Sequence, residues 1–567
     1  MNYTQQLPSS VYSESTLLKN LNAVALKNKK LFERICWPVN NDHIVFDEQQ
    51  KPAIKIHTSY RSLALSDDVC TAVLSPFNKS EIVFFMGIGN SELVDKAISI
   101  RTDSTIYIWD RDPWLLRLFL MKKDYSGIIK SGRLVILLGI DLIHSFMHLN
   151  KAGKVLHPVF EDLYQNEWIL LRDGLMEERA LLCSGLLFVD DVADTLRILG
   201  YSVFSLDYSL LSIEEIANLF ESYKPHLVFC INYIHGLSEW CERYNIPLLC
   251  WEIDPAVDSV ECNRSTPKNS YIFTYRKENL DIYSKAGFIH RDYWPLASNP
   301  GKRFPPVLSD KEKEKYSCRI SFVGESMVSQ SQVLFNRFLS LCAAFGMDHQ
   351  ECVARASNIL HEQRKDFSVF SIPLLLHKEF PELYADPVKL QSFKLNPVML
   401  LGEAAASEKR LYYMKALESY AINLWGDDAW QKIEGNGAIY RGKAGHRFEL
   451  NKIYSTSLIN IDINRIYQKD IVTMRVFDVL ACGGFVLTEY TDTLRELFEI
   501  GDELDTYTSI DDMNEKVEYY LSKPSLVHKI AQKGRERVLK DHTIHQRVQK
   551  MLEVAGIGFT SIQPQIR

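Results

Sequence analysis

The chain has 567 residues, of which 46% are hydrophobic and 24% charged, and its net charge is −7. This length predicts three or four domain-sized units with separate cores, and the composition excludes a disordered or fibrous protein. An acidic net charge argues against a protein whose whole surface binds nucleic acid, and we expect no nucleic-acid partner.

The cysteines and the apolar runs favour a cytoplasmic protein. The chain has eleven cysteines but no CxxC pair, and most of them lie inside apolar runs. This pattern is typical of reduced, buried cysteines and favours neither a disulfide framework nor a zinc site. No run reaches the ~20 apolar residues of a membrane span, and the first residues lack a basic segment followed by an apolar one. We therefore expect a cytoplasmic location and no membrane span.

Residues 1–155 are predicted to form a Rossmann-like accessory domain. The run EIVFFMGIGNSELVDKAISI gives a buried strand, a turn at Gly87 and Gly89, and a helix, and two more strand-like runs end at Asp110 and Asp141. Strand, glycine turn, helix and an acid about twenty residues further on form the nucleotide-binding pattern, in which Asp110 would meet a ribose. The turn and the acids after it resemble the N-terminal domain of motility-accessory-factor flagellin glycosyltransferases.

Two interpretations of this first domain stay open. The pattern lacks a third glycine, and Glu92 follows instead, where a carboxylate would repel a pyrophosphate. Because any tight turn from a strand into a helix needs glycine, the domain can be purely structural. The alternative is an enzyme that binds S-adenosylmethionine or a nucleotide cofactor through this domain.

Residues 178–300 are predicted to form a second α/β domain. Strands and helices alternate from ALLCSGLLFVDD to SYIFTY, which predicts a parallel sheet. Ligands of such sheets bind outside the carboxyl ends of the strands. We expect those ends at Ser184–Gly185, Asn232–Gly236, Trp251–Asp254 and Tyr275–Arg276.

Residues 316–540 are predicted to form a third α/β domain, with a helical insertion over about 331–420 that has its own small core. Near its end, the stretch from Ile459 to Leu497 gives a strand, a helix, a Gly-Gly turn and another strand, a parallel βαβ unit. Asp470 and Asp478 are eight residues apart, close to two helical turns, so we expect them to face one cleft together.

Several segments resemble the CgeB-like group of GT-B glycosyltransferases, over roughly residues 180–555 with gaps. They are WEIDP, YIFTYRKENLDIYSKAGF, WPLASNPGKRFPP, CRISFVGES and DVLACGG. The resemblance implies two Rossmann-like domains that face a cleft, the second similar to the C-terminal domain of group 1 glycosyl transferases. The extra N-terminal domain and the helical insertion would be additions to this fold. Residues 541–567 would be a C-terminal helix that braces the N-terminal half.

The resemblance also implies a donor site for a nucleotide sugar. In that family the acid at the position of Asp478 holds the ribose, and the acid at the position of Asp470 contacts the donor sugar. Family members also carry an arginine shortly after the Val-Gly of the first strand, and this chain lacks it, so another residue would have to supply that contact. The donor-binding residues that we predict are Gly324, Ser326, Gly426, Arg475, Asp478, Gly483, Gly484 and Glu489.

The expected chemistry is glycosyl transfer without a bound metal or a permanent cofactor. Helix dipoles and basic side chains, Arg475 first, would stabilise the diphosphate leaving group. If the reaction inverts the anomeric carbon, Asp254 is our first candidate for the general base and His235 the second, with Asp470 beside the donor sugar. If it retains the configuration, no such base is required. His542 and His545 have no third ligand nearby and are expected to be structural.

The sequence leaves the partners open. A protein acceptor such as flagellin, a surface-layer component, another molecule of a bacterial cell envelope and a small molecule all fit the resemblance, and no oligomeric state is predicted. A non-catalytic protein of the GT-B fold, with a binding or assembly role, is also compatible, because aspartates stand where the family usually has glutamates.

Overall fold

The structure is a computed structural model that describes residues 3–56, 59–77, 80–183, 187–254, 268–433, 437–445 and 448–559. The chain divides into two compact units. Unit 1 contains the residues up to Ile231 together with His235–Leu248, and unit 2 contains Asn232–Ile234 and Leu249–Gly558. The expected strand end at Ser184 and Gly185 lies outside the described residues.

Unit 1 begins with two helices that meet at Asn28. The extended backbone of Asn28 ends α1 (Glu14–Lys27), and its side chain accepts a hydrogen bond from the Leu31 amide and so starts α2 (Lys29–Ile35). Asparagine suits such a place because its side chain replaces a missing backbone acceptor. A small antiparallel sheet follows, made of β1 (Ile44–Phe46), β2 (Pro52–Ile56) and β3 (Ser59–Ser62).

Unit 1 contains a four-stranded parallel sheet with the order β6–β5–β4–β7. Its strands are β4 (Ile82–Met86), β5 (Thr105–Asp110), β6 (Leu134–Leu138) and β7 (Gly153–Leu156). Its helices are α3 (Asp67–Leu74), α4 (Glu92–Ile100), α5 (Pro113–Lys122), α6 (Ser126–Lys130), α7 (Asp141–Leu149) and α8 (Gln165–Asp173). Asp141 therefore begins a helix, where the sequence predicted the end of a strand.

The second sheet has the order β13–β12–β11–β10–β8–β9. Its strands are β8 (Arg179–Cys183), β9 (Ser202–Leu206), β10 (Leu227–Ile231), β11 (Leu248–Glu252), β12 (Ser270–Thr274) and β13 (His290–Tyr293). The helices that alternate with them are α9 (Val189–Ile198), α10 (Ile213–Tyr223), α11 (Leu237–Arg243) and α12 (Asn279–Lys285). β8, β9 and β10 are almost fully buried, which explains why they read as unbroken apolar runs.

The third sheet is parallel throughout and has the order β16–β15–β14–β17–β18–β19. Its strands are β14 (Cys318–Val323), β15 (Asn423–Trp425), β16 (Ile439–Tyr440), β17 (Ser457–Ile461), β18 (Val486–Glu489) and β19 (Asp505–Tyr507). Around it lie α13 (Asp310–Tyr316), α20 (Glu449–Thr456), α21 (Met474–Ala481), α22 (Asp492–Leu497), α23 (Ile510–Leu521), α24 (Pro524–Asp541) and α25 (Ile544–Val554). The order reverses between β14 and β17, as in a Rossmann sheet.

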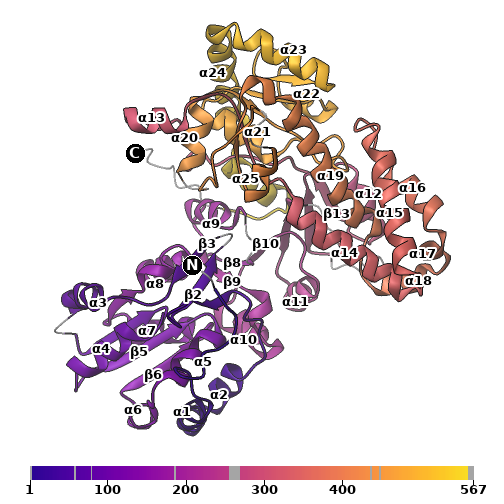
Figure 1. Ribbon diagram of the computed structural model, residues 1–567. Helices are drawn as coiled ribbons and strands as arrows, with labels where there is room; N and C mark the ends of the chain where they lie inside the picture. Colours follow the sequence, from indigo (N-terminus) through magenta and orange to yellow (C-terminus); the bar gives the residue numbers. More distant parts are fainter. Residues whose placement is uncertain are drawn as a thin grey trace. The chain divides into compact units, whose positions relative to one another are not determined.

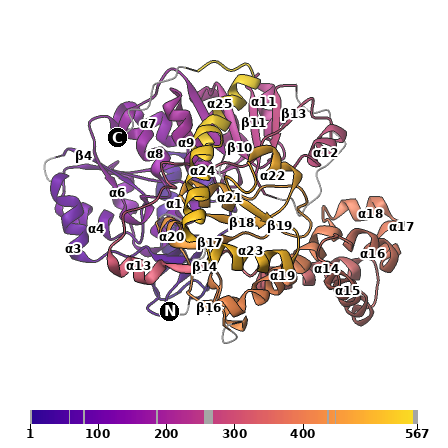
Figure 2. The ribbon, with the colours of Figure 1, turned by 90° about the horizontal axis from the view of Figure 1, so that it is seen from above.

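Between β14 and β15 the chain forms a group of helices with its own apolar core. The helices are α14 (Val328–Ala344), α15 (His349–Arg364), α16 (Ile372–Glu379), α17 (Pro381–Ala385), α18 (Pro387–Ser392) and α19 (Pro397–Ala416). Phe338, Ile359, Leu376 and Leu400 are fully buried in this core. Within unit 2, α15 to α18 project to one side of the third sheet, and α14 and α19 connect them to it (Figures 1 and 2).

The last helix, α25, packs against the segment that follows β13. The Ile544 amide donates to the Ser298 carbonyl at 2.9 Å, and the Arg547 guanidinium donates to the Pro295 carbonyl at 3.1 Å. Burial and the nearby Arg547 lower the pKa of His542 to about 4, so this imidazole is neutral and structural. In the described part of the chain, no helix combines the length and hydropathy of a membrane-spanning segment.

The predicted α/β class is confirmed, since the strands of parallel sheets alternate with helices along both units. The chain carries Rossmann-like sheets before and after the middle sheet, together with the predicted helical segment.

Candidate functional site

The candidate site lies in unit 2, where the strand order of the third sheet reverses. β14 and β17 are neighbours, and their carboxyl ends lie at Val323 and Ile461. α14 begins at Val328, just after the β14 strand, and runs for 17 residues. Free backbone amides and the helix dipole give such an N-terminus a preference for negatively charged groups. Ligands of open parallel sheets bind at this kind of reversal.

Two glycines let the backbone pack closely here. A Cβ atom on Gly324 would lie 2.8 Å from a guanidinium nitrogen of Arg475, and one on Gly426 would lie 2.2 Å from the Gly324 carbonyl oxygen. Trp430, fully buried, donates from its indole nitrogen to the same carbonyl at 2.8 Å. Gly426 and Trp430 therefore hold the Gly324 loop in place through contacts with its carbonyl. Trp430 belongs to the core.

Arg475 lies in the first turn of α21 and is held by a buried carboxylate. Its guanidinium donates to the Val323 carbonyl at 2.7 Å and pairs with Asp462, which is 0% exposed. Burial lowers the pKa of Arg475, but Asp462 more than offsets this, so the pKa is raised. Asp462 also accepts hydrogen bonds from Thr473 and Thr488 at 3.0 and 2.9 Å. This pair fixes the Arg475 side chain beside Gly324.

A second arginine, Arg410 of α19, is the feature that sequence reasoning missed. It is 7% exposed and donates to the Glu325 carbonyl at 2.5 Å. Within the described residues no carboxylate forms an ion pair with it. Burial first, and then the charges of Arg475 and Arg465, lower its pKa to about 9, and the more distant carboxylates of Asp462 and Glu403 offset this only in part. A buried cation without a counterion is costly, so its presence next to a helix N-terminus indicates a place for an anionic ligand.

Lys409, which precedes Arg410 on α19, belongs to a second set of contacts with Glu489 and Asn464. Lys409 is 5% exposed, pairs with Glu489 at 2.6 Å and donates to the Asn464 carbonyl at 3.3 Å. Glu489 also accepts from the Asn464 amide at 2.9 Å. The side-chain oxygen of Asn464 is buried without a hydrogen-bond partner in the ranges that the structure describes. Such an unpaired acceptor is suited to a ligand hydroxyl or amide.

Ser326 lies beside this loop but is already engaged. It is fully buried, and its amide and hydroxyl donate to Asp427 at 2.8 and 2.7 Å. The Ser326 carbonyl accepts from Ser407 at 2.9 Å. The Ser326 hydroxyl also accepts from the Val328 amide, the first amide of α14, at 3.3 Å. Ser326 therefore shapes and caps the turn into α14, and a ligand would have to use the next amides of the helix.

The glycine pair of the predicted turn lies at the other edge of the sheet. Gly483 (φ +73°) ends α21, and a Cβ atom on Gly484 would lie 2.3 Å from the Tyr454 carbonyl oxygen. Both residues precede β18, so they belong to its amino end, whereas Gly324 follows the carboxyl end of β14. Backbone geometry explains both glycines, and we correct their assignment to the donor site.

Only one of the two motif aspartates lies on α21, whereas the spacing was expected to bring both to one cleft from the helix start. α21 begins at Met474, so Asp470 (φ +51°) lies in the loop before it, where its carboxylate accepts from the Thr493 amide at 2.6 Å. Asp478 is 5% exposed and accepts from Ser298 at 2.7 Å and from Arg303 at 2.9 Å. The late helix start separates the two acids, and Asp478 ties the linker after β13 to α21.

The candidate bases lie at two other strand ends. Asp254 is exposed directly after β11, and Asn232, which follows β10, accepts from the Asp254 amide at 3.3 Å and donates to its carboxylate at 3.4 Å. Asn232 has φ +58°, a conformation that asparagine tolerates better than most residues. His235 is exposed in the loop after β10, in unit 1.

The corresponding place in the first sheet is filled. Cβ atoms on Gly89 and Gly87 would lie 2.2 Å from the His157 ring and 2.3 Å from the Phe160 ring. Asp110 is 0% exposed and accepts from the Ile88 amide at 3.2 Å and from the Tyr164 hydroxyl. Burial raises the pKa of Asp110 to about 7. The acid predicted to meet a ribose is thus enclosed by the protein itself.

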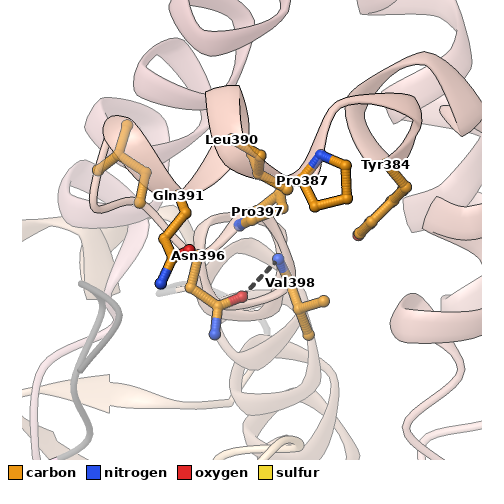
Figure 3. Close-up of a pocket in the computed structure, with 8 residues that line it drawn as sticks. Tyr384, Pro387, Leu390, Gln391, Asn396, Pro397 and Val398 are labelled. Carbon is orange, nitrogen blue, oxygen red and sulfur yellow. Dashed lines mark hydrogen bonds between the residues drawn. The ribbon is translucent and has the colours of Figure 1, made fainter. Parts of the chain in front are cut away.

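A hollow of about 350 Å³ lies elsewhere, in the helical group of unit 2. Figure 3 shows it where α17, α18 and α19 meet, with Asn396 hydrogen-bonded to the Val398 amide. It is lined by Tyr384, Pro387, Leu390, Gln391, Leu395, Asn396, Pro397 and Val398. None of these side chains carries a charge at neutral pH, so the hollow does not suit a diphosphate.

The comparisons with known proteins give one family model that matches part of the chain, and several solved structures. Residues 408–553 match the model of a glycosyl transferase-like family. This range is less than half of the chain, and it contains Lys409, Arg410, Asp462, Arg475 and Glu489. No curated protein matches the chain.

Similar solved structures are glycosyltransferases of low sequence identity. A glycosyltransferase from Rickettsia africae shares 12% identity, with 67% of this chain and 97% of that chain covered and a TM-score of 0.40. HepE from Anabaena, in complex with UDP and glucose, shares 8% identity, with 84% and 99% covered and a TM-score of 0.34. The β-glucosyltransferase of T4 phage shares 10% identity, with 67% and 99% covered and a TM-score of 0.35.

Proposed function

We propose that this protein is a glycosyltransferase of the GT-B type that takes a sugar from a nucleotide-sugar donor. The observation that carries the proposal is Arg410, a buried cation without a counterion at the strand reversal of the third sheet. It lies inside the range that matches the glycosyl transferase-like family. A nucleotide diphosphate would supply the missing negative charge.

The diphosphate would be held by the α14 amides after Gly324 and by Arg410. Arg475, which Asp462 holds next to Gly324, would add its positive charge without necessarily touching the diphosphate. When the bond between the sugar and the diphosphate breaks, negative charge develops on the diphosphate, and these preorganised donors stabilise it without reorganisation. The unpaired Asn464 oxygen would accept a hydrogen bond from the nucleoside or the sugar. The proposed reaction needs no metal ion for charge stabilisation.

For an inverting reaction, we propose Asp254 as the general base, with His235 as the second candidate. Asp254 is exposed, so a ligand can reach its carboxylate, and Asn232 orients it. Asp470 stays the candidate for a contact with the donor sugar, and Asp478 either touches the ribose or acts only through the linker. The acceptor we propose is a protein or another component of the cell envelope.

The proposal is tested by incubating the purified chain with UDP-, GDP-, dTDP- and CMP-sugars in EDTA and measuring the release of free nucleotide. We expect slow hydrolysis of one donor class, and at least roughly a hundredfold less in Arg410→Met, because a charged contact to the developing anion is lost. The matched control is Arg495→Met, an exposed arginine of α22. Binding of a donor without turnover would favour a non-catalytic protein. Equal hydrolysis by Arg410→Met would contradict the proposed site.

A further inference from the structure

The corner between α1 and α2 in unit 1 combines exposed lysines with exposed leucines. Leu18 and Leu26, two helical turns apart on α1, are 59% and 76% exposed. The buried residues of α1 lie on the opposite stripe, so both leucines point outward. They belong to a group that we call the basic corner. Its members are Leu18, Lys19, Leu26, Lys27, Lys29 and Lys30.

The positive charges of the lysines in the basic corner are only weakly neutralised by acidic side chains. Lys27 and Lys30 form no ion pair with any residue that the structure describes, and both are exposed. The Lys29 side chain is 82% exposed and 3.7 Å from Glu33, and the Lys19 side chain is 67% exposed and 3.9 Å from Asp124. Contacts this long and this exposed leave most of the positive charge available.

The basic corner is firmly supported from below. α1 packs against α5 and α6, and the buried Asn20 side chain donates to the Leu120 and Lys123 carbonyls at 2.7 Å each. Figure 1 shows α1, α2 and α6 gathered at one end of this unit. The exposed leucines are therefore not needed to close the core, and truncating them should leave the fold intact.

We propose that the basic corner binds the surface of an anionic lipid bilayer. Clustered lysines are attracted to anionic headgroups, and apolar side chains beside them can enter the boundary between headgroups and acyl chains. A bilayer suits a protruding corner because it deforms around exposed leucines, whereas a protein partner would need a matching hollow. The attraction is local, because the chain as a whole is acidic. This proposal does not depend on the proposed sugar transfer.

The test is cosedimentation of the full chain with vesicles of pure phosphatidylcholine and with vesicles that contain about a third phosphatidylglycerol. We expect binding to the anionic vesicles only, weakened by 0.5 M salt because counterions screen the charges. Lys29→Glu with Lys30→Glu should lower binding by at least roughly tenfold, since two attractive charges become repulsive. Leu26→Ser should lower the binding that survives at high salt.

The control is Lys55→Glu with Lys151→Glu, an equal charge change at two exposed lysines of unit 1 outside the basic corner. It should bind nearly as the unmodified chain does. Equal binding to both kinds of vesicle, no binding to either, or equal losses in the two double variants would overturn the proposal. Hydrolysis of the donor should be unchanged in all of these variants, so failure here and failure of the proposed function are separate results.

Discussion

The first and third sheets follow the same plan but treat the space at their strand reversal in opposite ways. Each has a central strand that ends in a glycine turn before a helix, at Gly89 in unit 1 and at Gly324 in unit 2. Beside Gly89 the space is filled by the His157 ring. Beside Gly324 lie the Arg475 guanidinium and the Phe322 ring, and Arg410 donates to the carbonyl of the next residue, Glu325. The glycine turn therefore does not decide whether a Rossmann-like sheet binds a ligand; the side chains brought in from neighbouring elements do.

The two sites differ in whether their buried polar groups are satisfied within the protein. The first site buries aromatic rings and satisfies Asp110 with internal hydrogen bonds. The third site keeps Arg410 without an ion-pair partner and the Asn464 side-chain oxygen without a hydrogen-bond partner among the described residues, which costs stability until a ligand arrives. Substitutions in the first site should therefore change stability but not donor binding. Substitutions in the third site should affect donor binding and stability to different extents.

The largest loss of stability is expected for Asp462→Ala. The change leaves Arg475 buried without its counterion and next to Arg410, and removing one partner of a buried pair costs about 3–5 kcal/mol. The free energy of unfolding in urea measures it. Asp492→Ala, at a side chain that is 69% exposed, is the control and should stay within about 0.5 kcal/mol. An equal effect of the two changes would show that Asp462 does not support the site.

Asp478→Ala should cost about 2–4 kcal/mol, because Arg303 then loses its buried carboxylate. Adding Arg303→Met should restore most of this loss, as a double-mutant cycle would report. If Asp478 acts only through the linker, the double variant also recovers the affinity for the donor. Recovered stability with affinity still lost would instead assign a ribose contact to Asp478.

Gly89→Ala should destabilise unit 1 by about 2 kcal/mol or more, because a side chain at φ +60° is strained and its Cβ would meet the His157 ring. Gly132→Ala, at φ +82° with open space around it, should lower stability only through backbone strain, by about 1 kcal/mol. Neither change should alter donor hydrolysis. A loss of hydrolysis with the fold intact would revive the interpretation in which the first domain binds a cofactor.

The smallest expected effect is on pH dependence. Burial lowers the pKa of His157 to about 4 from an ordinary value near 6.5, so the unfolded chain takes up a proton first as the pH falls. Stability from this group is therefore present above about pH 6.5 and lost toward pH 4, by about 1 kcal/mol at pH 5.5. His157→Leu should flatten the decline between pH 7 and 5. An unchanged decline would mean that other groups, such as His542, cause it.

The periodicity of the sequence was enough to predict the parallel strands and the helical group, because buried parallel strands read as unbroken apolar runs. It did not reveal the small antiparallel sheet of β1, β2 and β3. The site was only partly predictable. Arg475 and Gly324 lie in local motifs, whereas Arg410 arrives on α19, 86 positions after Gly324 along the chain. One available signal was the position of Lys409 and Arg410 in the middle of a helix that carries apolar runs on both sides. Asp470 was misplaced because α21 begins at Met474, which a pattern of acids cannot reveal.

The central claim is that Arg410 awaits the diphosphate of a nucleotide-sugar donor, and it is tested by measuring thermal unfolding with and without nucleoside diphosphates and their sugars. Without ligand, Arg410→Met should be at least as stable as the unmodified chain, because an unpaired buried charge is removed. One nucleotide should raise the melting temperature of the unmodified chain, since it binds only the native state, and should not raise that of the variant. A variant that is less stable and still responds fully to the nucleotide would contradict the account.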